Sequence, residues 1–283
     1  MDPQSHPVVV GVDGSQEALQ AARWAAAAAE RLDAPLCVVH ARPYSGHNPS
    51  DTVAAVRVAE RGAARETADS GTVLAAAQDA IGRHHTGVNA EFVYIAEPVD
   101  EVLVRLSVHA TMVVLGCGSV SPGAAILVGS TTVAVVSRAQ CPVVAWRGDV
   151  TEPDQRPIVV GVNGDDDARI AVTAAFELAD RFGAGVVAVH AGTMARSAEE
   201  SHLSAVIDPL VRLYPDVEVT LVVDKDKPAR ALLRQLDGAQ LVIVGSRGRG
   251  LLTGALLGST GLNLLHHSPV PAMICRSSRA SHD

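Results

Sequence analysis

The chain has 283 residues, of which 48% are hydrophobic and only 3% aromatic, so Val, Leu, Ala and Ile must fill its core. This length predicts two domains, and the hydrophobic content excludes an intrinsically disordered chain. The net charge of −8 argues against a protein that binds nucleic acid through a basic surface. The four cysteines form no C-x-x-C pair, so neither a zinc site nor thioredoxin-like chemistry is indicated.

The first residues lack the basic segment and the long apolar run of a secretory signal. Nowhere does the sequence approach the roughly 18 uninterrupted apolar residues of a membrane helix. We therefore expect a soluble cytoplasmic protein with no membrane contact and no nucleic-acid partner.

Two stretches of the sequence are repeated. Residues 8–41 align without gaps with residues 158–191, and residues 112–131 align with residues 241–260. The repeat is too long for a solenoid unit, so it indicates a duplicated domain. A polar segment that contains proline separates the copies. We therefore predict a first domain, a linker and a second domain at residues 1–148, 149–156 and 157–283.

Each copy alternates strand and helix signals. In chain order, the first copy predicts a strand at Val8–Val12, a helix at Gln16–Leu32, a strand at Leu36–Ala41, a helix at Thr52–His84 with Gly71 as a candidate break, a strand at Val88–Ile95, a helix at Val99–Val108, a strand at Met112–Gly116, a helix from about Gly129 and a strand at Val143–Trp146. The second copy repeats this order, with strands at Pro157–Val162, Val186–His190, Val217–Val223, Leu241–Gly245 and Ala272–Cys275. This alternation predicts an α/β protein with two tandem, doubly wound parallel sheets.

In such sheets, ligands bind beyond the carboxyl ends of the strands, where the strand order reverses. Glycines stand at these ends, and the fourth strand of the second copy leads into Gly245–Gly248, nine further residues and then Gly258–Thr260. Glycines let backbone amides approach a phosphate, and a helix that starts at Gly258–Thr260 would offer free N–H groups. This is no Walker A loop, because neither lysine of the chain follows a glycine. Because lysines are few, we expect Mg²⁺ to share the phosphate charge.

The pattern G-x2-G-x9-G-[S/T] after the fourth strand, with an Asp at the end of the first strand, resembles the ATP-binding pattern of the universal stress protein family. The tandem arrangement resembles the two-domain members common in actinobacteria, and the resemblance covers nearly the whole chain. It implies an adenine-nucleotide alpha-hydrolase-like fold with strand order 3-2-1-4-5. It also implies ATP as the cofactor, with adenine against the ends of the first two strands and the phosphates in the glycine loop.

The resemblance also implies a set of nucleotide-binding residues. In the first copy they are Gly11, Asp13, Ala41, Gly116, Ser119, Gly129, Ser130 and Thr131. In the second copy they are Gly161, Asn163, Ala191, Gly245, Arg247, Gly248, Gly258, Ser259 and Thr260. Each copy departs once from the pattern, with Ser119 in place of a glycine and Asn163 in place of the Asp. Simpler roles remain open, because the glycines also suit tight turns, Asp13 suits a helix cap and Arg247 suits a solvated surface.

Other candidate residues point to no further chemistry. His40 and His190 follow apolar strands, which is typical of histidines at the edge of a core. The adjacent pairs at His84 and His266 have no carboxylate or cysteine placed near them by the sequence, so we predict no protein metal site. No G-x-S-x-G or H-E-x-x-H motif occurs, and we predict no catalytic residues.

We therefore expect an ATP-binding regulator of the stress or dormancy response, with slow ATP hydrolysis at most. The alternatives are an interaction scaffold that binds no nucleotide, and a weak ATPase. A regulatory protein partner of unknown identity is expected. The short apolar fifth strands, Val143–Trp146 and Ala272–Cys275, would lie at sheet edges, and exposed edges of this kind invite pairing. We predict that they pair with each other within one chain, and that whole chains form a homodimer.

Overall fold

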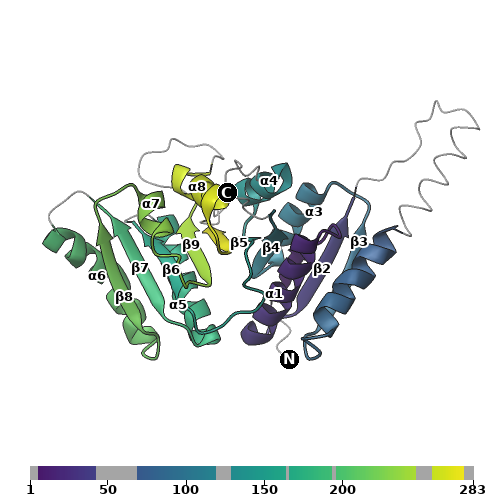
Figure 1. Ribbon diagram of the computed structural model, residues 1–283, viewed down its shortest axis with the longest axis horizontal. Coiled ribbons are helices and arrows are strands. Elements are labelled where there is room, and N and C mark those ends of the chain that lie inside the picture. Colours follow the sequence, from purple (N-terminus) through teal and green to yellow (C-terminus); the bar gives the residue numbers. More distant parts are fainter. Residues whose placement is uncertain are drawn as a thin grey trace, which may run out of the picture.

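The computed structural model describes residues 6–42, 69–118, 129–163, 166–192, 196–246 and 257–276. Strands and helices alternate along the described chain, and the strands join into one ten-stranded sheet (Figure 1). Helices cover both faces of this sheet. The predicted helical residues 52–68 lie outside the described residues.

The first five strands form one half of the sheet in the order β3-β2-β1-β4-β5, with all neighbours parallel. This order and the α/β class were predicted, and both are confirmed. The strands are apolar and buried because helices pack on both faces, as is usual in parallel sheets. Their bounds are β1 Val8–Gly11, β2 Leu36–Ala41, β3 Ala90–Ile95, β4 Met112–Gly116 and β5 Val143–Trp146.

The second five strands repeat this arrangement, in the order β10-β9-β6-β7-β8. Here too, all neighbours are parallel. The duplicated sequence thus folds twice into the same strand order. The bounds are β6 Ile158–Val162, β7 Val186–Ala191, β8 Val219–Asp224, β9 Leu241–Gly245 and β10 Ala272–Cys275.

The two halves join where β5 pairs with β10, and this is the antiparallel pair of the sheet. Val144 lies opposite Met273, and Ala145 lies opposite Ala272. All four residues of each strand are buried. The predicted pairing of the two fifth strands within one chain is therefore confirmed, and β3 and β8 are left as the outer strands.

Two apolar clusters lie on the two faces of the sheet. One contains buried residues of α1 (Gln16–Leu32), α5 (Asp166–Phe182), α6 (Arg196–Leu213) and the helical residues 69–82. The other contains α3 (Val99–Leu106), α4 (Ser130–Arg138), α7 (Pro228–Leu233) and α8 (Ser259–His267). Each cluster contains residues of both copies. On each face of the sheet, therefore, a single core spans the two halves and holds them together.

The helix at residues 69–82 is continuous through Gly71, so the candidate break there is wrong. A Cβ added at Gly71 would meet no heavy atom within 4 Å, and the residue is exposed. A glycine on the outside of a helix costs only about 1 kcal/mol relative to alanine, and the packed turns after it offset this cost.

The segment between β5 and β6 is fixed to both halves of the protein. Arg31, at the end of α1, donates hydrogen bonds to the backbone oxygens of Phe182 and Pro153. Gln240 accepts from the backbone N–H of Asp154 and donates to the backbone oxygen of the same residue. Gln240 is almost fully buried, so the segment between β5 and β6 is packed against the second half and is not a free linker.

We expect Val144→Asp to destabilise the protein strongly, because it would place an unpaired carboxylate in the β5–β10 seam, where Val144 has no exposed surface. A buried charge without a partner costs about 3–5 kcal/mol. Urea unfolding measures the change. The control is Val108→Asp, since Val108 is 46% exposed. Equal stability of the two variants would contradict the buried seam.

Candidate functional site

The turn from β1 into α1 is held together by Asp13. Its Oδ1 accepts hydrogen bonds from the Ser15 backbone N–H at 2.9 Å and from the Ser15 hydroxyl at 2.6 Å. Ser15 is the N-cap of α1, and its Oγ accepts from the Ala18 N–H. Gly14 allows the turn because its φ is +87°. Asp13 is exposed and therefore combines a structural role with access to solvent at the end of β1.

The end of β4 lies against the first turn of α1. A Cβ added at Gly116 would lie 2.6 Å from backbone atoms of both Glu17 and Ala18. Only a residue without a side chain permits this approach. Gly116 thus brings the β4 end and the Asp13 turn to the same place, as the sequence predicted for the reversal of strand order.

The start of α4 lies beside the end of β4. The backbone N–H of Cys117 donates to the Trp146 oxygen at 2.8 Å, and the Cys117 sulfur lies 3.5 Å from the hydroxyl oxygen of Thr132. Gly129 is the N-cap of α4, and no side chain caps the helix. The Gly129 oxygen accepts from the Val133 N–H, so the N–H groups of residues 130–132 precede every intrahelical acceptor.

The first turn of α4 presents donors in an accessible position. Gly129 and Ser130 are exposed and Thr131 is half-buried. A Cβ added at Gly129 would meet nothing within 4 Å, so the space above the helix start is open. The turn contains no acidic residue. Free N–H groups, two hydroxyls and the positive end of the helix dipole favour an anion.

In the second copy the start of α8 also lies beside the end of a strand, but a backbone hydrogen bond holds it there. Gly258 is the N-cap of α8, again without a side-chain cap. Its N–H donates to the Ser246 oxygen at 2.8 Å, which ties the helix start to the end of β9. This N–H is therefore already used, and the donors that remain are those of Ser259, Thr260 and Gly261.

The two strand-end histidines are structural. His40 and His190 are 7% and 2% exposed, and their Nδ1 atoms lie 2.7 and 2.8 Å from the backbone oxygens of Val12 and Val162. The prediction of core-edge histidines is confirmed. Each histidine holds the end of the first strand against the second, next to Ala41 or Ala191, which are both half-buried at this edge.

Packing accounts for the glycines inside the first strands. A Cβ at Gly11 would lie 2.9 Å from a methyl group of Leu115, and one at Gly161 would lie 3.1 Å from Val244. Asn163 follows β6 and is half-buried, as is Gly245 at the end of β9. Three predicted site residues lie outside the described residues, namely Ser119, Arg247 and Gly248.

Sequence reasoning missed an ion pair that occurs in both copies beyond the third strand. Arg105 donates to both carboxylate oxygens of Glu97, at 2.6 and 3.1 Å, and these bonds lower the pKa of Glu97. In the second copy, Arg234 donates to Asp226 and to Asp224. The Lys227 N–H and then Arg234 lower the pKa of Asp226. The sequence signal for this ion pair is an acidic residue that stands eight positions before an arginine in both copies, Glu97 before Arg105 and Asp226 before Arg234.

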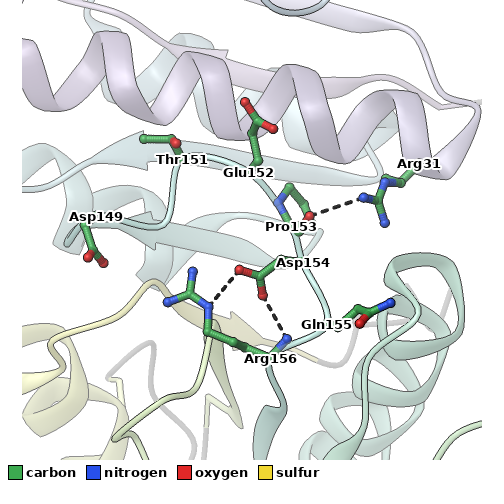
Figure 2. A pocket seen from close by; sticks show the side chains of 8 residues that line it. All are labelled: Arg31, Asp149, Thr151, Glu152, Pro153, Asp154, Gln155 and Arg156. Carbon is green, nitrogen blue, oxygen red and sulfur yellow. Dashed lines mark hydrogen bonds and ion pairs between the residues drawn. The ribbon is translucent and has the colours of Figure 1, made fainter.

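Two hollows lie beside the first turn of α1 and along the linker between β5 and β6. One, of about 380 Å³, lies between the first turn of α1 and the chain after β5, with Gln20, Cys117 and Asp149 in its wall. The other, of about 550 Å³, is an open hollow along residues 149–156 and is lined mainly by charged side chains (Figure 2). In it, Asp154 accepts from the side chain and the backbone of Arg156.

Within the described ranges, no group of three or more His, Cys, Asp or Glu side chains is placed to hold a metal ion. In the same ranges, no helix is long and apolar enough to span a membrane. Burial raises the pKa of the Cys141 thiol to about 12, and burial followed by the Glu91 carboxylate raises that of Cys37. These two thiols stay protonated at neutral pH and are poor nucleophiles.

Comparison with known proteins gives one consistent result. The model of the universal stress protein family matches residues 5–147 and again residues 155–276. A universal stress protein of Mycobacterium tuberculosis is 35% identical over 97% of this chain and 98% of its own length. One from Mycolicibacterium smegmatis is 32% identical over 95% and 96%. The crystal structure of a universal stress protein from Archaeoglobus fulgidus aligns with a TM-score of 0.72 at 19% identity, covering 96% of this chain and 99% of that one.

We expect Gly116→Ala to destabilise the protein by about 1–3 kcal/mol, because the new methyl group would overlap the backbone of α1. The matched control is Gly118→Ala, two residues further on, where an added Cβ meets nothing within 4 Å. Urea unfolding of both variants measures the difference. A loss for Gly118→Ala as large as that for Gly116→Ala would mean that the close approach to α1 is not the cause.

Proposed function

This chain belongs to the universal stress protein family, and we propose that each of its two copies binds an adenine nucleotide, with ATP as the ligand. The phosphates lie at the starts of α4 and α8, and the nucleoside lies over the ends of the first two strands of each copy. Nucleotide occupancy then controls binding to a regulatory protein partner during the stress response, in the cytoplasm.

One observation carries the proposal. Two helices, at equivalent places in a duplicated fold, begin with an uncapped Gly-Ser-Thr turn beside the strand ends where a doubly wound sheet binds its ligands. A glycine N-cap has no side chain that could accept from these N–H groups, and it costs only about a few tenths of a kcal/mol relative to Ser, Thr, Asn or Asp. A protein that repeats this feature at both sites gains from leaving the N–H groups available.

In the first copy, the residues that support this role come from three segments. The start of α4 supplies N–H groups and the hydroxyls of Ser130 and Thr131 to phosphate. Asp13 supplies a carboxylate next to the ribose, and the Ala41 backbone supplies polar atoms to adenine. The second copy uses the start of α8, Asn163 and Ala191 in the same way. Mg²⁺ would enter with the nucleotide and neutralise part of its charge, since the start of α4 contains no lysine.

Two other functions make different predictions. A scaffold that binds no nucleotide would yield no adenine compound when the purified protein is extracted with acid and analysed by mass spectrometry. A weak ATPase would release ADP over hours from bound ATP. The Asp13 carboxylate already accepts two hydrogen bonds from Ser15, so it is poorly placed to serve as a general base, and slow turnover at most is expected.

We expect Ser130→Asp to abolish ATP binding at the first site and Ser259→Asp to abolish it at the second. An aspartate in the first helical turn favours the helix dipole, so folding should be preserved, while its charge repels phosphate. Isothermal titration calorimetry should then show one site in each variant and none in the double variant. The controls are Ser130→Asn and Ser259→Asn, which have the same size without the charge. Two intact sites in the double Asp variant would reject the proposal.

Asp13→Ala should weaken the first site more than Asn163→Ala weakens the second. A hydrogen bond to a charged group contributes about 1.5–3 kcal/mol, against about 0.5–1.5 for a neutral one. The first variant should therefore lose roughly tenfold in affinity or more. Each is titrated with the other site closed by Ser259→Asp or Ser130→Asp, and unfolding measurements account for the loss of support to Ser15. Equal losses would mean that backbone groups alone hold the nucleoside.

A further inference from the structure

Arg147 is a buried cation without a partner. It is the residue after β5, is only 1% exposed, and none of its three guanidinium nitrogens has a hydrogen-bond partner in the described part of the chain. A guanidinium stays charged at every physiological pH. An unpaired charge in a protein interior is strongly unfavourable, so an anion beside a buried arginine of this kind would stabilise it.

The backbone places Arg147 beside the first phosphate site. The carbonyl oxygen of Trp146 accepts from the N–H of Cys117, so Arg147 begins next to the end of β4. Val143 and Ala145 pack in the same cluster as the buried residues of α4, whereas Trp146 belongs to the opposite face. By this alternation, Arg147 follows Ala145 onto the face that α4 covers.

The first turn of α4 is fixed at the same place, because Thr132 contacts Cys117. Two positive groups, the α4 N-terminus and the Arg147 guanidinium, therefore lie on the same face of the sheet, at the ends of the neighbouring strands β4 and β5. They would repel each other unless an anion lies between them.

The neighbouring chain supplies no carboxylate for this role. Residues 119–128, which connect β4 to α4, contain no Asp or Glu, and the first turn of α4 contains none. Asp149 is close in sequence, but it is exposed and accepts no hydrogen bond from the Arg147 guanidinium. No carboxylate of the described residues accepts a hydrogen bond from Arg147, so an anion from outside the chain is free to take that place.

We infer that Arg147 binds the phosphate group of the ligand in the first copy, from the β5 side, opposite the amides of α4. This inference rests on the proposed function and deepens it. The planar fork of an arginine suits two oxygens of one phosphate or of two neighbouring phosphates. The second copy differs, because its counterpart Arg276 is half-buried and already has a partner. The ligand affinity of the first site should therefore depend on the phosphate groups more than the affinity of the second site does.

The test compares the intact chain with Arg147→Met and Arg147→Lys in a Ser259→Asp background, where only the first site is open. ATP, adenosine and inorganic pyrophosphate are titrated by calorimetry, and thermal unfolding is followed with and without each ligand. Arg147→Met should weaken ATP and pyrophosphate about tenfold or more and leave adenosine unchanged. Arg147→Lys should keep part of the affinity, since it retains the charge without the fork. Arg276→Met is the matched control and should leave the first site unchanged.

Without ligand, Arg147→Met should unfold at a higher temperature than the unsubstituted chain, because it removes an unpaired buried charge. A lower temperature would show that the guanidinium has partners within the chain, and it would overturn the inference. If Arg147→Met does not fold, Arg147→Lys alone decides, and unchanged affinity for ATP and pyrophosphate in that variant overturns the inference.

The outcomes separate the inference from the proposed function. Equal ATP affinity in Arg147→Met and the unsubstituted chain overturns the inference and leaves nucleotide binding intact. Pyrophosphate binding that needs Arg147, with no preference for ATP over pyrophosphate, supports the inference and rejects adenine recognition. Binding of neither ligand by the unsubstituted chain rejects both.

Discussion

The antiparallel pairing of β5 with β10 is the contact on which the rest of the molecule depends. Each of these short strands is apolar along its whole length and would otherwise be an exposed sheet edge. Their pairing turns two five-stranded sheets into one sheet and merges the cores on each face. It also places α4 and α8 on the same face, with both helix starts held by strands next to the seam. The edges of β5 and β10 are therefore not available for pairing between whole chains.

Close approach between elements determines which chain segments come together at the end of β4. Gly116 lets the end of β4 touch the backbone of α1, and this contact brings three chain segments together at one strand end. No side chain of the described residues caps the start of α4, whereas the Ser15 hydroxyl caps the start of α1. The two helix starts beside these strand ends are thus capped differently, one by a serine hydroxyl and the other by no side chain.

Duplication has allowed the two sites to diverge within a common geometry. The start of α4 is held by a contact between the Cys117 and Thr132 side chains, whereas the start of α8 is held by a backbone hydrogen bond from Gly258 to Ser246. In the described part of the chain, the arginine after the last strand of the first copy is buried without a hydrogen-bond partner, whereas its counterpart in the second copy has a partner. The segment between β5 and β6 is bonded to both halves through Arg31 and Gln240.

The sequence by itself determined the duplication, the alternation of strands and helices and the place of the two glycine-rich helix starts. These follow from periodicity, spacing and turn chemistry, which are local properties of the chain, whereas the strand order was implied by the family resemblance. Only the tertiary structure decided that packing against Leu115 explains Gly11, that contact with α1 explains Gly116, and that Arg147 is buried without a partner. Each of these facts depends on residues distant in sequence that fill, or fail to fill, the space around a side chain. A single sequence without its fold does not contain the positions of those neighbours, so burial and pairing at such sites are decided by packing.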